Sequence, residues 1–505
     1  MTGSGDIRRR VTMVTVVWGQ WYLRAHLALN LPSLLAYGNL PRFCECHDMS
    51  YIIVTRAADV PTIDTSPAIH ALRQFMTVEI RTIPESEIAN PIETHQRIWS
   101  AATTEAKSKG TFVLFMPPDV AWSDGSFAHL AELLSAGRRL VFMTYLRVVA
   151  ETFVPAVLQR SNKPGSALRL PPRELVDMAM HHVHPLMAAH MRDSPYFPYH
   201  PEMVVWPVRD EGILVRCLAR ELFLFDPQHM ALSRQLLASE EIDRTVFEFV
   251  DNSDNLFAVS LAPLGKDAAW HLKAIRADEA KIANWWLAYD SPMNDLISSF
   301  RIRWHWKGVT KQRWHRAELV SDRWVRRLAA TREGLRVWNT LIDTGNWEAA
   351  SLVAAAIRLR ALPRSLRNAV GTAAIVFIPP PHAVSTILEA RRKPPVDAVG
   401  LQRILQRYIV LQKSPRAIPL EDLAPTAAPL LIRSLDGTYL TVKRTTAGIT
   451  VAGSRVIAPY LRSGNHLIYL LDGLLEPRTG RPKRLENLPN QTYSAMSDAQ
   501  PPICS

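Results

Sequence analysis

A single carboxylate, Asp119, closes the apolar run Thr111–Met116, and a second acidic turn follows at Asp124 and Gly125. In an open α/β sheet, ligands bind beyond the carboxyl ends of the strands, because the loops there can approach a ligand while the sheet stays rigid. A carboxylate at such a point can hold a divalent cation against a pyrophosphate. The spacing therefore predicts Asp119 as a catalytic and metal-binding residue at a phosphate site.

A structural role competes with this interpretation at both acidic positions. Asp124 or Ser126 can satisfy the free amides of a helix that begins near Phe127, and for Asp124 this capping role is favoured. For Asp119, at the strand end itself, the functional and the structural interpretation both remain open.

The elements that must position these residues are strands alternating with helices. The β-branched run Val11–Trp18 ends at Gly19 and is typical of a buried strand. Further strands are predicted at 51–55, 76–83 and 140–144, and helices at 22–35 and 92–109. This alternation predicts the α/β class, with a mostly parallel sheet and helices on both faces.

Composition narrows the classes of partner. A chain of 505 residues with 48% hydrophobic residues is long enough for about three domains. It has no apolar run of the roughly 18 residues that span a membrane, and its first apolar run is too short for a secretory signal, so a cytoplasmic location is expected. The formal charge of +12 favours anionic partners. Because nucleic-acid-binding signatures are missing, no nucleic-acid partner is expected.

Cysteines and histidines give little indication of a metal site. Cys44 and Cys46 flank a glutamate and are close to His47, but a second ligand pair is missing, so zinc is not expected. Four histidines fall in an irregular segment without a metal-binding spacing such as HExxH, and they are expected at the surface or as helix caps: His181, His182, His184 and His190.

The segment Arg301–Trp338 is rich in arginine and lysine, with five interleaved tryptophans. Such an amphipathic helix suits an anionic membrane surface, where rings lie at the headgroup level and cations meet lipid phosphate. The alternative is an inter-domain helix whose tryptophan rings pack inward while arginine covers the solvent face, and this alternative is favoured.

Five short motifs resemble the bacterial GT-A-type glycosyltransferase-like proteins over about residues 11–265: Val16–Tyr22, Leu31–Leu35, Gly38–Pro41, Pro118–Phe127 and Leu146–Val149. The resemblance implies a GT-A-like, Rossmann-like mixed sheet and a nucleotide-diphosphate sugar as donor. It also implies that Asp119 lies near the diphosphate with a divalent cation, Mg²⁺ or Mn²⁺. The family's Asp-x-Asp metal motif reads Pro117-Pro118-Asp119 here, so the first acidic ligand is missing.

The resemblance also implies further site residues. The donor is expected over the strand ends at Val17, Trp18, Gly19, Thr55 and Arg56. Arg56 or Arg97 could take the diphosphate charge directly through a bidentate fork. Transfer to a glycan or protein acceptor with inversion needs a base for the acceptor hydroxyl, and the candidates are Asp251 and Asp254. Both could equally be residues of an Asx turn before a strand.

The C-terminal third resembles a fasciclin-like domain over about residues 335–478. Four segments carry this resemblance: Thr372–Pro380, Leu435–Gly437, Gly448–Ile457 and Asn465–Pro477. It implies an α+β module that contacts other proteins rather than an enzyme. Tyr408 and Ile409 stand where the family has a Tyr-His pair.

These inferences predict a flexible tail at 1–10, a GT-A-like domain at 11–270, a helical basic connector at 271–334, the fasciclin-like domain at 335–478 and a disordered tail at 479–505. The expected function is sugar transfer from a nucleotide-diphosphate donor. The alternative is a non-catalytic scaffold in which both domains bind protein partners. A location at the inner face of the membrane, through Arg301–Trp338, is compatible with either.

Overall fold

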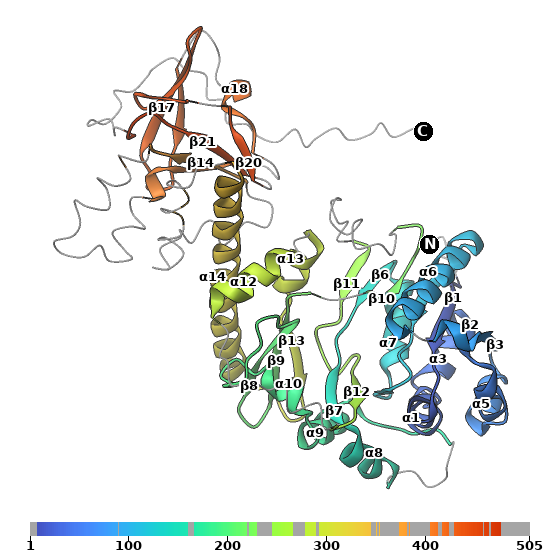
Figure 1. The fold of residues 1–505 in the computed structure, drawn as a ribbon. Coiled ribbons are helices and arrows are strands. Elements are labelled where there is room, and N and C mark those ends of the chain that lie inside the picture. The colour runs from blue at the N-terminus through green and yellow to red at the C-terminus, as the bar shows by residue number, and fades with distance from the viewer. Residues whose placement is uncertain are drawn as a thin grey trace, which may run out of the picture. The chain divides into compact units, whose positions relative to one another are not determined.

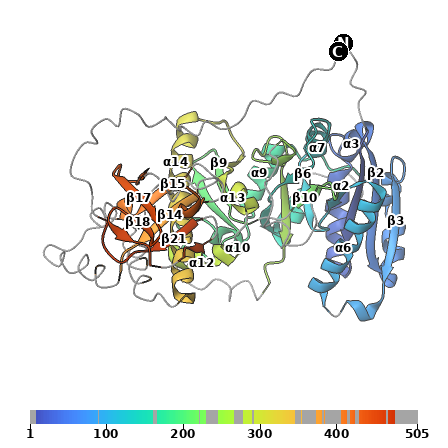
Figure 2. The same ribbon diagram turned by 90° about the horizontal axis from the view of Figure 1, so that it is seen from above.

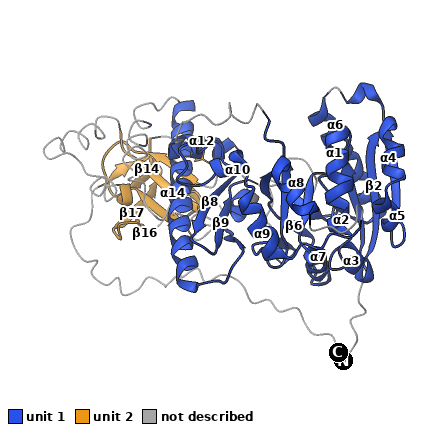
Figure 3. Ribbon diagram, turned by 90° about the horizontal axis from the view of Figure 1, so that it is seen from below, with its two compact units in different colours: residues 1–372 blue, residues 373–505 orange. Residues whose placement is uncertain are grey.

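The computed structural model divides into two compact units, residues 1–372 and residues 373–505 (Figure 3). It describes residues 8–88, 90–159, 166–219, 222–229, 245–265, 278–288, 292–344, 350, 353, 373–380, 383, 405–412, 417–423, 429–457, 459–463 and 466–475. Most of the expected N-terminal tail (residues 1–7) and the whole expected C-terminal tail (479–505) lie outside these residues. Each unit is described by itself.

Unit 1 is built on a seven-stranded sheet with the order β11-β6-β10-β4-β1-β2-β3 (Figure 1). Its strands are β1 (Arg10–Val16), β2 (Asp48–Arg56), β3 (Thr77–Ile83), β4 (Phe112–Phe115), β6 (Leu140–Phe142), β10 (Leu222–Phe225) and β11 (Phe247–Phe249). Neighbours pair in parallel except β10, which is antiparallel to both β4 and β6. The predicted α/β class is confirmed, and β10 makes the sheet mixed.

Helices cover both faces of this sheet, which explains why β1 is apolar on both sides. Val14 and Val16 pack on one face with Ile98 of α6 (Pro91–Lys109). Val11 and Met13, which alternate with them along the strand, pack on the other face with Phe43 of α3, and Figure 2 shows α6 opposite α3 and α7. The helices of this part are α1 (Gln20–Ala25), the π-helical turn η1 (His26–Asn30), α2 (Leu31–Leu34), α3 (Leu40–Cys46), α4 (Val60–Asp64), α5 (Pro67–Leu72), α6 and α7 (Ser126–Ser135), with 3-10 turns at Ala57–Asp59 and Glu85–Glu87.

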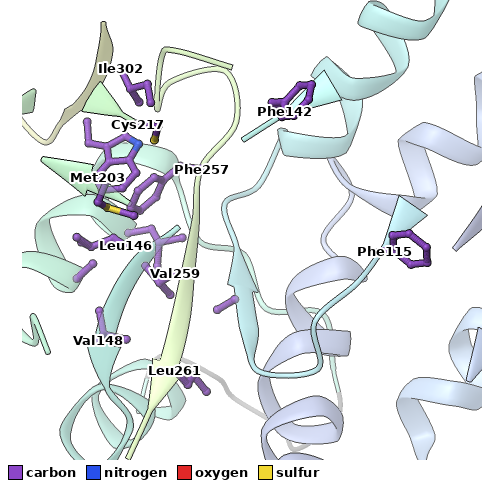
Figure 4. Close-up of a cluster of buried hydrophobic side chains, with 14 of the residues drawn as sticks. Phe115, Phe142, Leu146, Val148, Met203, Cys217, Phe257, Val259, Leu261 and Ile302 are labelled. Carbon is purple, nitrogen blue, oxygen red and sulfur yellow. The ribbon is translucent and has the colours of Figure 1, made fainter. Parts of the chain in front are cut away.

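Two three-stranded sheets extend unit 1. One has the order β5-β12-β7 and the other β13-β9-β8. Their strands are β5 (Val120–Trp122), β7 (Leu146–Val149), β8 (Met203–Val208), β9 (Gly212–Cys217), β12 (Ala258–Ala262) and β13 (Ile302–His305). Figure 4 shows Leu146 and Val148 of β7 beside Val259 and Leu261 of β12, inside the same buried cluster as Phe115 at the end of β4. The small β5-β12-β7 sheet is thus packed together with the large sheet.

The remaining helices of unit 1 include the basic, tryptophan-rich segment. They are α8 (Ala150–Leu158), α9 (Pro172–His181), α10 (Pro185–Ala189), α12 (Glu279–Ala288), α13 (Pro292–Ser299) and α14 (Lys311–Asp343). Trp304, Trp314 and Trp324 are at most 3% exposed, so these rings pack inward, as the inter-domain alternative predicts. The expected helical connector is interrupted, because β13 pairs with β9 of the preceding region. No helix among the described residues is long and apolar enough to cross a membrane.

Unit 2 contains two small four-stranded sheets, β15-β14-β21-β20 and β16-β17-β18-β19. Their strands are β14 (Ala373–Ile378), β15 (Ile409–Gln412), β16 (Leu430–Arg433), β17 (Tyr439–Thr445), β18 (Gly448–Val451), β19 (Ser454–Arg455), β20 (Leu461–Ser463) and β21 (His466–Leu470), with the short helix α18 (Leu420–Leu423). Apart from the parallel pair β14 and β21, all pairings are antiparallel.

Candidate functional site

The order of the large sheet reverses direction between β1 and β4. From β1 the chain passes to β2 and β3 on one side, and it then returns to β4 on the other. At such a switch point the loops after the two central strands diverge and leave a crevice at the carboxyl edge, where α/β proteins bind ligands. In this chain the loops are Val17–Gly19 after β1 and Met116–Asp119 after β4.

Asp119 lies in the turn between β4 and β5, and its backbone carbonyl accepts a hydrogen bond of 2.8 Å from the Leu261 amide. Burial raises the pKa of the Asp119 carboxyl group to about 6, while its own backbone amide and the Arg147 guanidinium act in the opposite direction. The carboxylate is therefore ionised at neutral pH against an unfavourable environment. A cation or a hydrogen-bond donor on a ligand would stabilise the ionised form.

Two side chains that the sequence analysis missed lie near this carboxylate. Burial, and secondly the charge of Asp119, raise the pKa of the Tyr22 hydroxyl on α1. Arg147, exposed on β7, is close enough for its charge to lower the pKa of Asp119, and in the β5-β12-β7 sheet Arg147 pairs with Ser260 and Ser260 with Val120, the residue after Asp119. Arg147 could not be found from local spacing, because the register of three strands distant in sequence brings it near Asp119.

The loop that carries Asp119 is held by the helices after β1. The side-chain amide of Asn30 donates hydrogen bonds to the Val120 carbonyl at 2.7 Å and to the Pro117 carbonyl at 3.4 Å. The Ser33 hydroxyl accepts 3.1 Å from the Trp122 amide. Asn30 ends the π-helical turn η1, a feature that is frequent at functional sites. The loop after β4 is thus held by the helical turns η1 and α2 that follow β1.

Of the residues predicted to bind the donor, Trp18, Gly19 and Arg56 are partly exposed and Arg97 is exposed. Gly19 has φ +82° and open space around its Cα, a conformation that favours glycine. Val17 and Thr55 are at most 1% exposed, so their side chains line the floor beneath the loops and not the surface.

The two predicted arginines are already paired. Arg56 forks onto Asp59 with distances of 2.8 and 2.9 Å, and Asp59 also accepts the Gly19 amide at 3.2 Å. Arg56 therefore positions the loop after β1 through Asp59. Arg97, on the exposed side of α6, forms an ion pair with Glu87.

An aromatic row runs from the loop after β1 along α6. Trp18 stacks on His95 with ring centroids 5.0 Å apart, and Trp99, one helical turn further, stacks on Phe115 at 4.6 Å. Burial lowers the pKa of His95, so this ring is neutral at pH 7 and can act as an apolar platform. Because residues four apart lie on the same face of a helix, the sequence could have shown that His95 and Trp99 point the same way.

Asp124 does not cap α7, contrary to the favoured interpretation. Its carboxylate accepts the Gly38 amide at 2.9 Å and pairs with Arg169 at 2.8 Å. A different side chain bonds to the start of this helix: the Phe127 amide donates a 3.2 Å hydrogen bond to the side-chain oxygen of Asn39. A Cβ on Gly38 would come within 2.6 Å of the Asp124 carboxylate, so the contact requires glycine.

The two candidate bases, Asp251 and Asp254, follow β11 and differ from each other. Asp254 accepts a fork from Arg173 at 3.0 and 2.8 Å and a 2.8 Å bond from the buried His305, and chiefly the Arg173 bond lowers its pKa. A carboxylate so paired is a weak base. Asp251 is exposed, but burial of its carboxyl group by the surrounding residues raises its pKa.

These acids are separated from Asp119 along one edge of the sheet. Because β10 is antiparallel to both β4 and β6, and β11 is parallel to β6, the carboxyl ends of β4 and β11 face the same way. Three strand spacings of about 4.8 Å, or about 14 Å, separate β4 from β11. Asp119 and Asp251 thus open onto one edge without forming a single cluster.

A protein-built metal cage is not evident. Within the part of the chain that the structure describes, no three His, Cys, Asp or Glu residues are placed to hold a metal ion. Mg²⁺ often binds through one or two carboxylates, water and substrate phosphates, so Asp119 fits only a cation that a phosphate ligand also holds.

The other candidate metal ligands have structural roles. Burial raises the pKa of the Cys44 thiol to about 12, which disfavours the thiolate that zinc needs. Each histidine of the irregular segment is hydrogen-bonded within the fold: His181 to the Asp177 carbonyl, His182 to the Thr152 hydroxyl, His184 to the Pro263 carbonyl and the Leu186 amide, and His190 to the Leu186 carbonyl. The expectation of surface or capping histidines is consistent with these bonds.

The chain has distant structural similarity to two glycosyltransferases. Apo mouse xyloside xylosyltransferase 1 is 11% identical with a TM-score of 0.19, over 36% of this chain and 75% of that one. The mannosyltransferase PcManGT from Pyrobaculum calidifontis, in complex with GDP-Man and Mn²⁺, is 14% identical with a TM-score of 0.24, over 72% and 83%. TM-scores this low support no conclusion about the activity of this chain.

No protein-family model matches the sequence, and no characterised protein gives a significant match. The resemblance of residues 335–478 to fasciclin-like domains therefore gains no support.

Proposed function

We propose that unit 1 is a glycosyltransferase that binds a nucleotide-diphosphate sugar at the switch point between β1 and β4. The observation that carries the proposal is Asp119, a carboxyl group with a raised pKa at the carboxyl edge of an α/β sheet, next to an accessible glycine loop. Such an acid is stabilised by the cation that accompanies a diphosphate.

The aromatic row supports a nucleotide rather than a simple phosphate as the ligand. Trp18 is partly exposed and rests on His95, so its other face is a platform on which a base can stack. The Gly19 loop, free of a side chain, allows the diphosphate to approach the backbone closely.

Two groups could meet the charge of the leaving diphosphate. A Mg²⁺ or Mn²⁺ ion brought with the donor would be held by Asp119, and when bound it would supply charge stabilisation. Arg147 is an exposed cation of this chain on the same side and could stabilise the same charge without a metal. Neither predicted base fits the reacting centre: Asp254 is held by Arg173 and His305, and Asp251 follows β11, about 14 Å from β4.

The test is a calorimetric titration of the purified full chain with UDP-, GDP- and dTDP-sugars, each with Mn²⁺ and with a chelator. We expect one donor class to bind, slow hydrolysis of that donor, and loss of both with Asp119→Ala. Asp177→Ala, an exposed aspartate on α9, is the matched control and should bind as the wild type. Absence of binding for every nucleotide sugar under both conditions contradicts the proposal.

A non-catalytic scaffold is the second candidate, and one observation favours it. Asp119 stands without a second acidic ligand, and no group of three metal ligands occurs in the described ranges. A scaffold predicts a stoichiometric protein partner that requires residues 335–478, together with a wild-type phenotype for Asp119→Ala. Binding of an anionic membrane through α14 is compatible with either function, but it would depend on exposed arginines and not on the buried tryptophans.

A further inference from the structure

A cavity opens at the same edge of the sheet, beyond the end of β11. Its volume is about 600 Å³, within the range of small-molecule sites. We call it the β11 pocket, and its lining residues are Phe247, Glu248, Asp251, Asn252, Leu296, Ser299, Phe300, Arg301 and Arg303.

The wall of the β11 pocket is held in place by buried bonds. Arg216, 3% exposed, donates to the carbonyls of Ser299 and Phe300 at 2.9 and 3.0 Å and to Asp322 at 2.8 Å. On the opposite side, the Arg303 amide donates 2.7 Å to the Asp251 carbonyl. The pocket wall is therefore preformed, so that binding does not have to order it.

The charges around the β11 pocket select against simple ions. A bare anion would meet Asp251 and Glu248, and a bare cation would meet Arg301 and Arg303. The two arginines are also neutralised by partners on α14, since Arg301 forks onto Asp322 and Arg303 binds Glu318. A neutral ligand with many hydroxyls can use both signs, because each hydroxyl donates to a carboxylate and accepts from a guanidinium.

The apolar part of the lining suits the flat face of a ring. Phe300 lies against Phe247 and Phe249 with centroid distances of 5.7 and 5.4 Å, and Leu296 is buried beside them. An aromatic surface bordered by carboxylate and guanidinium groups matches a sugar ring, which is apolar on its face and polar at its edge.

We infer that the β11 pocket binds one sugar unit of a neutral oligosaccharide, remote from the unit that reacts. This inference rests on the proposed function, because it assigns the acceptor. The pocket and Asp119 open onto one edge, and the roughly 14 Å between β4 and β11 is a span that a chain of sugars can bridge. Asp251 is then a binding residue for the acceptor, and it lies too far from β4 to take the proton of the acceptor hydroxyl that attacks the donor.

The experiment is a calorimetric titration of the full chain, without donor, with neutral trisaccharides built from glucose, galactose, mannose and N-acetylhexosamines. We expect one class to bind, with affinity reduced about tenfold or more by Asp251→Ala, since a hydrogen bond to a charged group is lost. Ser299→Trp fills the pocket from its exposed rim and should abolish binding. Asn255→Ala, exposed on the same loop but outside the lining, should leave the affinity unchanged.

Absence of trisaccharide binding, or binding that none of these variants alters, overturns the inference. So does preferential binding of inorganic phosphate or of a free amino acid in the β11 pocket. Donor binding is measured separately on the same variants. If nucleotide sugars bind with wild-type affinity while trisaccharides do not, the inference fails and the proposed function stands. If trisaccharides bind at the pocket and no nucleotide sugar binds, the proposed function fails and the pocket is not an acceptor site.

Discussion

Replacing Asp119 with asparagine should stabilise the protein while it removes donor binding. Burial raises the pKa of this carboxyl group from 3.8 to about 6. The difference between the two values corresponds to about 3 kcal/mol of destabilisation by the ionised form at pH above 6. Because the side chain is partly exposed, we expect Asp119→Asn to increase the free energy of unfolding at pH 7.5 by about 1 to 2 kcal/mol.

The sign of the pH dependence follows from proton binding. Between pH 4 and 6 the folded state holds more protons at this group than the unfolded state, so the contribution of Asp119 to stability falls as pH rises. The advantage of the variant should therefore be full above about pH 6.5 and should vanish near pH 4. Asp254→Asn is the matched control with the opposite sign, since Arg173 and His305 lower the pKa of Asp254, and its loss should destabilise the protein at pH 7.5.

The measurement is urea denaturation followed by tryptophan fluorescence. All 14 tryptophans lie in the first 347 residues, so the signal reports unit 1 alone. A destabilising effect of Asp119→Asn at pH 7.5, or a gain that does not change between pH 4 and 7.5, would refute the reasoning. Either result would mean that the carboxylate is well stabilised by the apo protein and is not poised for a ligand.

Three further predictions concern the same region. Burial lowers the pKa of His26 to about 4, so acidification from pH 6.5 to 4 should cost about 3 kcal/mol of stability, and urea denaturation across this window should show the loss in the wild type but not in His26→Gln. Gly38→Ala should lower the unfolding free energy by about 1 to 3 kcal/mol, because its Cβ would lie 2.6 Å from Asp124, whereas Gly308→Ala, in open space, should leave it within about 0.5 kcal/mol. Trp18→Ala should weaken nucleotide-sugar binding about tenfold in calorimetry with little effect on trisaccharide binding, and an equal loss of both would contradict separate sites.

The parallel core of unit 1 could be predicted from the sequence because its strands are buried on both faces. Such strands appear as continuous apolar runs, and the predicted strands at 11–18 and 51–55 correspond to the buried β1 and β2. The strand predicted at 76–83 corresponds to β3, the edge strand, whose side chains are mostly exposed or half-buried. The helix predicted at 92–109 is α6, and the strand end at Asp119 is the turn after β4. These features depend on local pattern alone.

The reversed strand β10 and the surroundings of Asp119 could not be predicted in this way. Antiparallel insertion of β10 between β4 and β6 depends on pairing across about a hundred residues, and apolar runs carry no direction. Arg147 reaches Asp119 only through the register of β7, β12 and β5. By contrast, the pairing of Arg56 with Asp59 spans three residues and was readable as a local ion pair.

The separation of Asp119 from Asp251 bears on how a transferase with this geometry would work. A base must come within hydrogen-bond reach of the acceptor hydroxyl, which itself must contact the carbon attached to the diphosphate. An acid about 14 Å from the strand that positions the diphosphate does not meet this requirement in the arrangement seen here. Asp251 can therefore act on an acceptor by holding it, and the proton must be taken by a group closer to β4. Tyr22 lies near Asp119 but is a poor base, because burial and the charge of Asp119 raise its pKa and keep its hydroxyl protonated at neutral pH. If activity is found, retention of a measurable rate by Asp251→Asn with an increased KM for the acceptor would agree with a binding role, whereas an unchanged KM with loss of kcat would return Asp251 to the reacting centre.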